Sequence, residues 1–119
     1  MSPLHRIAPP LAVMALIFFL SAQPGLDSGL GAWDLLLRKL AHVTIFAVLW
    51  FALARAFEWR RPVLAAAIAL AYAISDEWHQ SFVADRTGSP VDVAIDALGI
   101  GLAALLWALA TRPTASRAR

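Results

Sequence analysis

Four long apolar segments account for most of this 119-residue chain, and they restrict its fold more than any other feature. They cover about residues 7–22, 35–57, 62–80 and 91–110. A helix needs about 20 apolar residues to cross the hydrocarbon core of a bilayer. The segments lack the strict alternation of polar and apolar residues that a barrel strand requires. The sequence therefore predicts an all-α integral membrane protein, a single-domain bundle of four transmembrane helices.

The composition agrees with this prediction. Hydrophobic residues make up 61% of the chain and charged residues only 15%, whereas a soluble domain is about 45–50% apolar and about 25% charged. The net charge of +2 is small and is set among apolar runs, so it indicates membrane topology and not a nucleic-acid partner. The chain has no cysteine, which excludes disulfides and thiolate chemistry. No cofactor is expected.

The first apolar segment has two interpretations. As a transmembrane helix, it is expected to place Pro9 and Pro10 in its first turn, where proline is tolerated. As a secretory signal peptide, it would offer one basic residue, a short apolar stretch and the small pair Ser21-Ala22. The following Gln23-Pro24 is a poor context for cleavage. A retained helix is therefore the favoured interpretation.

Basic residues are divided unevenly between the two faces that four crossings would define. Seven of the ten Lys and Arg residues fall on the face of the two termini and the 55–61 loop. Because Lys and Arg concentrate on the cytoplasmic side, both termini are expected in the cytoplasm. Seven of the eight acidic residues fall on the other face. Acidic residues contribute little to topology, so their gathering at the extracytoplasmic face indicates a different role.

The unusual polar residues all lie where this topology brings chain segments together at the extracytoplasmic face. The start of the second helix, the end of the third, the 81–90 loop and the start of the fourth meet there. Residues three, four or seven positions apart share one face of a helix, so each helix presents a polar stripe. The members of these stripes and of the loop are Lys39, His42, Glu77, Gln80, Arg86, Asp92 and Asp96.

Charged side chains are costly at membrane depth and usually turn inward and pair. One interpretation is that these residues only lock the bundle through buried ion pairs. Apolar replacements often stabilise a protein as well as buried pairs do, so convergence at one face favours a binding or catalytic site. The candidate catalytic residues, as proton carriers, are His42, Glu77, Asp92 and Asp96. The candidate ligand-binding residues are Lys39, Gln80 and Arg86.

Three further groups near these stripes have weaker signals. His79 lies about a third of a turn away from the stripe of Glu77 and Gln80. Asp76 shares the face of Gln80 and is either a second acceptor or an interfacial charge. His42 with Glu77, Asp92 or Asp96 could bind a metal, but the chain has no tight ligand spacing such as His-Glu-x-x-His. No metal site is expected.

Small residues on the fourth segment predict close packing against another helix. Gly99 and Gly101, with Ala97 and Ala103, are the residues that carry this pattern. In membranes such residues let two helix backbones approach each other.

Four short motifs occur in order: Lys39-x-x-His42 with Phe46, Asp76-Glu77-x-x-Gln80-x-Phe82, Arg86-Thr87-Gly88, and Asp92-x-x-x-Asp96-x-x-Gly99. Over residues 35–106 they resemble the VanZ-like family of small bacterial membrane proteins. That family usually has asparagine where this chain has Asp96, which adds an acidic group. The resemblance implies a location in the bacterial cytoplasmic (inner) membrane. It also implies a link to glycopeptides, since the founding member is associated with low-level teicoplanin resistance.

The function expected from these features is binding or modification of a cell-envelope component. A membrane lipid or lipid-linked molecule that enters laterally between helices is the expected partner. Two alternatives are a non-catalytic accessory or binding module and a small proton-coupled transporter. Intramembrane His, Asp and Glu residues are typical of proton relays. Here they are confined to one face, which counts against transport.

The lack of cysteines makes the topology measurable with one introduced thiol. Ser89→Cys places it in the loop between the third and fourth segments, which is expected outside the cytoplasm. A membrane-impermeant maleimide should therefore label this variant from the extracytoplasmic side. Labelling only from the cytoplasmic side would show that the topology is the reverse of the predicted one.

Overall fold

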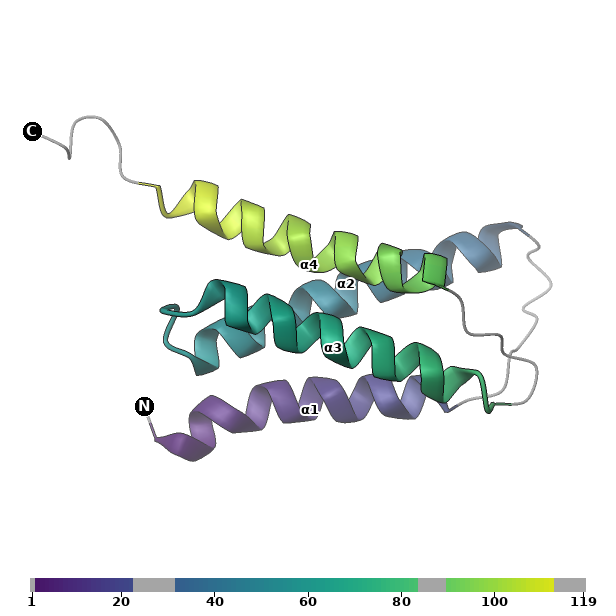
Figure 1. Ribbon diagram of the computed structural model, residues 1–119, viewed down its shortest axis with the longest axis horizontal. Coiled ribbons are helices and arrows are strands. Elements are labelled where there is room, and N and C mark those ends of the chain that lie inside the picture. The colour runs from purple at the N-terminus through teal and green to yellow at the C-terminus, as the bar shows by residue number, and fades with distance from the viewer. Residues whose placement is uncertain (1, 23–31, 84–89, 113–119) are drawn as a thin grey trace, which may run out of the picture.

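The computed structural model describes residues 2–22, 32–83 and 90–112. All regular secondary structure in these residues is α-helical (Figure 1). Four helices are present over these residues, as the sequence predicts. They begin and end close to the expected residues, although the first two start a turn or less earlier. Their bounds are α1 Pro3–Ser21, α2 Ala32–Ala56, α3 Pro62–Gln80 and α4 Pro90–Ala110.

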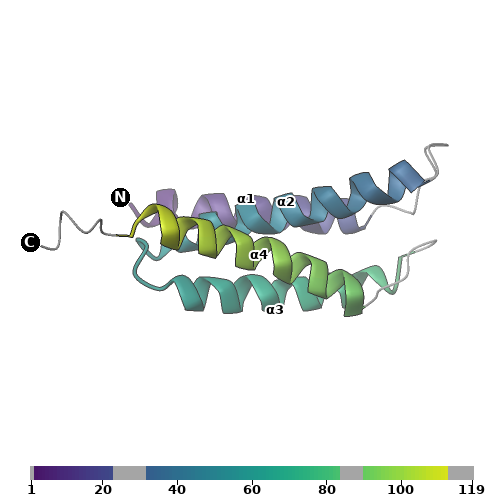
Figure 2. The same cartoon turned by 90° about the horizontal axis from the view of Figure 1, so that it is seen from above.

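Neighbouring helices in the sequence run in opposite directions. The ends of α1 and α3 and the starts of α2 and α4 consequently gather at one end of the bundle, which we call the polar end (Figure 1). The start of α1 and the end of α4 lie at the opposite end (Figure 2). Among the described residues, α2 contacts each of the other helices, whereas α1 and α4 do not contact each other. Helix α2 is thus the central element of the bundle.

Three of the helices are long and apolar enough to cross a membrane. These are α1, the Leu36–Ala56 part of α2, and α4. Helix α3 has the same length as α1, 19 residues, but its last turns carry Asp76, Glu77 and Gln80. The chain is therefore a four-helix protein with three candidate membrane spans, and a crossing by α3 remains a prediction.

The apolar core is built from large side chains on α2 and small ones on α3. Phe46, Leu49 and Trp50 are fully buried on α2. The facing helix contributes alanines four residues apart, Ala65, Ala69 and Ala73, all fully buried. Because this spacing keeps the alanines on one face, α3 can pack closely against its neighbours. Large apolar side chains on the outside of the bundle are left exposed, as a lipid-facing surface requires.

Pro9 and Pro10 correct one expectation for α1. The helix begins at Pro3, capped by Ser2, so the later prolines lie inside the helix and not in its first turn. A proline has no N–H, so Pro9 leaves the His5 carbonyl without its helical donor. Arg55 of α2 donates from Nη1 to the His5 oxygen at 2.9 Å and replaces that donor. Arg55 of α2 thus compensates for the hydrogen bond that Pro9 removes.

Helices α2 and α4 cross with their backbones in close contact at Gly99. This glycine is buried, and a Cβ built at its position would overlap the carbonyl oxygen of Val43. The expected close packing is confirmed at this position. The expectation of close packing is wrong for Gly101, which is exposed and has open space where a Cβ would lie. The two glycines lie on different faces of α4, and only one faces α2.

We expect Gly99→Ala to destabilise the protein and Gly101→Ala not to. The first substitution forces α2 and α4 apart, and such overpacking costs roughly 1–3 kcal/mol. The second adds a methyl group in open space and removes a flexible residue from a helix, a gain of up to about 1 kcal/mol. The free energies of unfolding can be compared by denaturant titration in detergent micelles. Equal values for the two variants would contradict the close crossing.

Candidate functional site

Two polar pairs join α2 to α4 at the polar end. Lys39 Nζ donates to the Asp92 carboxylate one turn from where His42 Nδ1 meets Asp96 Oδ1 at 3.1 Å. The side chains of Lys39 and Asp92 are 34% and 24% exposed, whereas that of Asp96 is fully buried. The outer pair is thus accessible from outside the bundle, whereas in the inner pair only Asp96 is enclosed, since the His42 side chain is 27% exposed.

A second polar group joins α1 to α3. Asp76 accepts hydrogen bonds from the Ser21 hydroxyl and from Gln80 Nε2, the latter at 2.9 Å. Gln80 Nε2 also lies 3.3 Å from Ser21 Oγ, which accepts from it. All three side chains are buried. Buried polar groups are almost always hydrogen-bonded, and this group satisfies itself between two helices.

The two groups meet at His42, Asp76 and Asp96. Each residue offers one nitrogen or oxygen atom, and these atoms lie within 4.8 Å of one another. Three helices, α2, α3 and α4, therefore place potential ligands at one point. We use the name polar cluster for the joined set, which comprises Ser21, Lys39, His42, Asp76, Gln80, Asp92 and Asp96.

The structure brings together most of the residues predicted from the sequence. Lys39, His42, Gln80, Asp92 and Asp96 belong to the polar cluster. Glu77 is next to Asp76 on α3 and is 6% exposed. Arg86 lies outside the residues that the structure describes.

Two members of the cluster, Asp76 and Ser21, have weak signals in the sequence. For Asp76 the sequence indicates either an acceptor or an interfacial charge, whereas its side chain is buried, with 4% exposed, and accepts from Ser21 of α1 and from Gln80 of its own helix. For Ser21 the sequence indicates only a small residue of a possible cleavage site. The one signal for Asp76 was its shared face with Gln80, and nothing local to Ser21 indicated its role. The His79 ring stacks on the Phe18 ring, with 4.5 Å between the ring centroids, and does not join the polar cluster through a hydrogen bond among the described residues.

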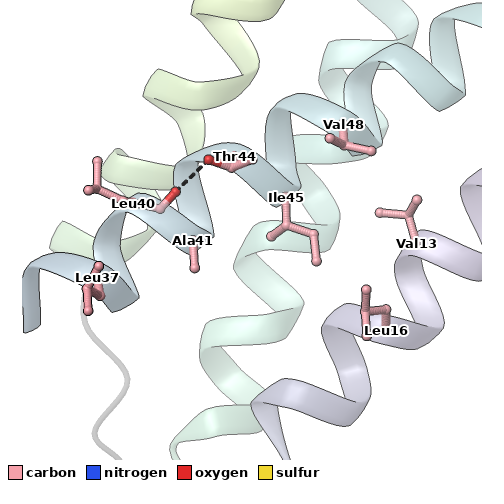
Figure 3. Close-up of a pocket in the computed structure, with 8 residues that line it drawn as sticks. All are labelled: Val13, Leu16, Leu37, Leu40, Ala41, Thr44, Ile45 and Val48. Atoms are coloured by element: carbon pink, nitrogen blue, oxygen red, sulfur yellow. Dashed lines mark hydrogen bonds between the residues drawn. The ribbon is translucent and has the colours of Figure 1, made fainter. Parts of the chain in front are cut away.

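An apolar groove of about 540 Å³ opens between α1 and α2 (Figure 3). Its one lining hydroxyl, Thr44 Oγ1, donates to the Leu40 carbonyl at 2.8 Å. That hydroxyl is therefore satisfied within α2 and adds little polarity to the groove. The lining residues are Val13, Leu16, Leu37, Leu40, Ala41, Thr44, Ile45 and Val48.

Apolar helices packed around a polar cluster at one end define a small helical membrane protein. The chain belongs to the VanZ/LLP1 family, whose family model matches residues 7–111. The family suspected from the motifs is thereby confirmed. The match also extends over most of α1, which those motifs did not include. Comparisons with curated proteins and with solved structures find no match.

We expect Ser21→Ala to destabilise the bundle more than Ser75→Ala. Ser21 bridges Asp76 and Gln80 in the interior, and leaving a buried partner unsatisfied costs roughly 1–3 kcal/mol. Ser75 is exposed and donates only within its own helix, to the Tyr72 carbonyl, so its loss should cost less than about 0.5 kcal/mol. Unfolding in detergent measures both changes. Similar losses for the two serines would contradict a structural role of the α1–α3 group.

Proposed function

We propose that this protein binds an anionic lipid or lipid-linked molecule of the cell envelope. In this proposal the headgroup lies at the polar cluster and one hydrocarbon chain lies in the α1–α2 groove. The observation that carries it is that the first turns of α2 serve both places. Lys39 and His42 face α4 in the cluster, while Leu37 and Ala41 line the groove. A molecule with a polar head and an apolar tail matches this arrangement.

Lys39 is the proposed contact for the headgroup. A lysine ammonium is a compact positive charge with three donors and commonly binds phosphate as a point charge. Its side chain is about one-third exposed although it is paired with Asp92. It can therefore reach an anionic group without leaving the bundle. Arg86, which the topology predicts on the same face, would supply a second cation.

The groove is proposed to select the tail by shape. Transfer of a chain from surrounding lipid into a protein groove gains no hydrophobic free energy, because both places are apolar. Contacts with the groove therefore contribute van der Waals packing, and the affinity for a particular molecule depends on its headgroup. This division of roles predicts that Lys39 and the groove make separate contributions to the binding free energy of the lipid.

The location that we propose is the bacterial inner membrane, with both termini in the cytoplasm and the polar end on the extracytoplasmic side. The bias of Lys and Arg residues toward the opposite end supports this orientation. A protein that holds an envelope component at that face would change how much of it is accessible to teicoplanin. Catalysis, if it follows binding, would draw its proton carriers from His42, Glu77, Asp92 and Asp96.

Native mass spectrometry of the purified protein with its co-purified lipids tests the proposed binding. Ala41→Phe fills the groove and should reduce the lipid-bound fraction, while Ala71→Phe, an exposed position on α3, should not. Lys39→Gln removes the headgroup contact and should weaken binding roughly tenfold, equivalent to about 1.4 kcal/mol. Unchanged lipid occupancy in both Ala41→Phe and Lys39→Gln would refute the proposal.

Comparison of cellular lipids with and without the protein separates binding from modification. A lipid species that changes only when the protein is present, and that no longer changes with Glu77→Gln or Asp92→Asn, would indicate turnover. The same variants, made at normal protein levels, should also lose any effect on teicoplanin susceptibility. If both variants keep the wild-type phenotype, the polar residues only lock the bundle.

A further inference from the structure

We infer that His42, Asp76 and Asp96 form a binding site for one divalent metal cation. This goes beyond the proposed lipid binding and does not depend on it. One nitrogen or oxygen atom from each residue lies within 4.8 Å of the others, at the point where α2, α3 and α4 meet. No local spacing could indicate such a site from the sequence, because each ligand comes from a different helix.

The ligand set favours a transition metal such as Zn²⁺ or Mn²⁺. Imidazole suits zinc and other first-row metals, and carboxylates suit harder cations such as manganese. Zinc binds both ligand types at about 2.0–2.2 Å, which puts neighbouring ligand atoms roughly 3.4 Å apart in a tetrahedron. His42 Nδ1 and Asp96 Oδ1 are already 3.1 Å apart. Movement of the Asp76 side chain toward this pair would complete three protein ligands.

Asp96 supplies an independent indication that something is bound here. Its side chain is fully buried, and Oδ2 has no hydrogen-bond partner among the described residues. An unsatisfied buried carboxylate oxygen is costly, since it has lost its water without a replacement. A cation bound by both oxygens of this carboxylate would satisfy the second oxygen as well as the first.

The charges of the cluster point to the same conclusion. The hydrogen-bond partners of Asp76 are the neutral side chains of Ser21 and Gln80. Asp96 has His42 as its partner. Two buried carboxylates and one imidazole therefore lie together, and buried charges usually require pairing or a metal ion. A divalent cation neutralises both carboxylates and leaves the imidazole neutral, as a ligand must be.

The surroundings also fit a metal site. Metal-binding carboxylates are usually held in turn by hydrogen bonds from neighbouring groups, and Ser21 and Gln80 hold Asp76 in this way. His42 packs against the ring of Phe46, with 6.2 Å between centroids. Its side chain is 27% exposed, so one side of the site is accessible. Three protein ligands and an open position are typical of a metal that also binds an exogenous ligand.

Metal content of the purified protein tests this inference. The protein is made without a polyhistidine tag, stripped with a chelator in detergent, loaded separately with Zn²⁺ and Mn²⁺, and desalted. Elemental analysis should find about one ion per chain for at least one of the two metals, as three protein ligands predict. The same metal should raise the melting temperature of the wild-type protein, since binding to the native state stabilises it. If neither metal is retained and neither metal raises the melting temperature, the inference is overturned.

Matched variants locate the ion. His42→Gln and Asp96→Asn should each weaken metal binding by at least roughly tenfold, since loss of a supporting group alone costs about 10–100-fold. His5→Gln and Glu58→Gln remove the same kinds of group at exposed positions on the opposite end and should bind as the wild type does. Equal binding in all four variants would place the ion elsewhere and refute the site. For a variant that does not fold, the proton NMR spectrum of Co²⁺ bound to the wild type reports a coordinated imidazole directly, through its hyperfine-shifted ring N–H resonance. A spectrum without imidazole ligation would refute the site as well.

The metal-binding and lipid-binding experiments test the two proposals separately, because each can succeed when the other fails. Metal retention is measured on delipidated protein, and lipid occupancy is measured on chelator-treated protein. Loss of lipid in Ala41→Phe with normal metal content would support the groove alone. Loss of metal in Asp96→Asn with normal lipid content would support the cation site alone.

Discussion

The contact between Gly99 and the Val43 backbone is the constraint on which the rest of the structure depends. It sets the distance between α2 and α4, since no side chain separates the two helices there. His42 is next to Val43, and Asp96 lies one turn before Gly99, so the inner pair forms directly beside the crossing. Lys39 and Asp92 form the outer pair one turn farther out. Short side chains such as aspartate can pair across two helices only because the backbones are this close.

Helix α3 reverses the usual arrangement of a soluble amphipathic helix. Its buried residues are alanines and the polar side chains Asp76, Glu77 and Gln80, whereas Leu70 and Ile74 face outward. In a bilayer this order is favourable, since the apolar residues meet lipid and the polar residues meet partners in the bundle. Helix α3 is not among the candidate spans, which are judged by length and composition alone, because the polar residues of its last turns lower its hydropathy. Its position depends on partners from neighbouring helices, including Ser21 and the Met14 carbonyl of α1, which accepts from Tyr72 at 2.5 Å.

The sequence predicted the features that depend on one helix at a time. Segment lengths predicted the four helices, and residues three or four apart predicted which side chains of α2 and α4 share a face. Features that depend on how one helix is rotated against another could not be predicted. The role of Ser21 and its contact with Asp76 could not be predicted for this reason, because only the packing of α1 on α3 turns the two side chains toward each other. Gly101 was misjudged since a small residue does not show which face of α4 meets α2.

Asp96 links the fold to the chemistry of the site. An asparagine at this position would be a neutral side chain that can both donate and accept hydrogen bonds. Aspartate offers only acceptors when ionised, so it needs a donor or a cation at each oxygen. In the described structure one oxygen meets His42 and the other meets no hydrogen-bond donor. The Asp96 side chain is fully buried one turn from the Gly99 crossing. The extra negative charge therefore makes a positive group at this point more necessary in this chain than asparagine would.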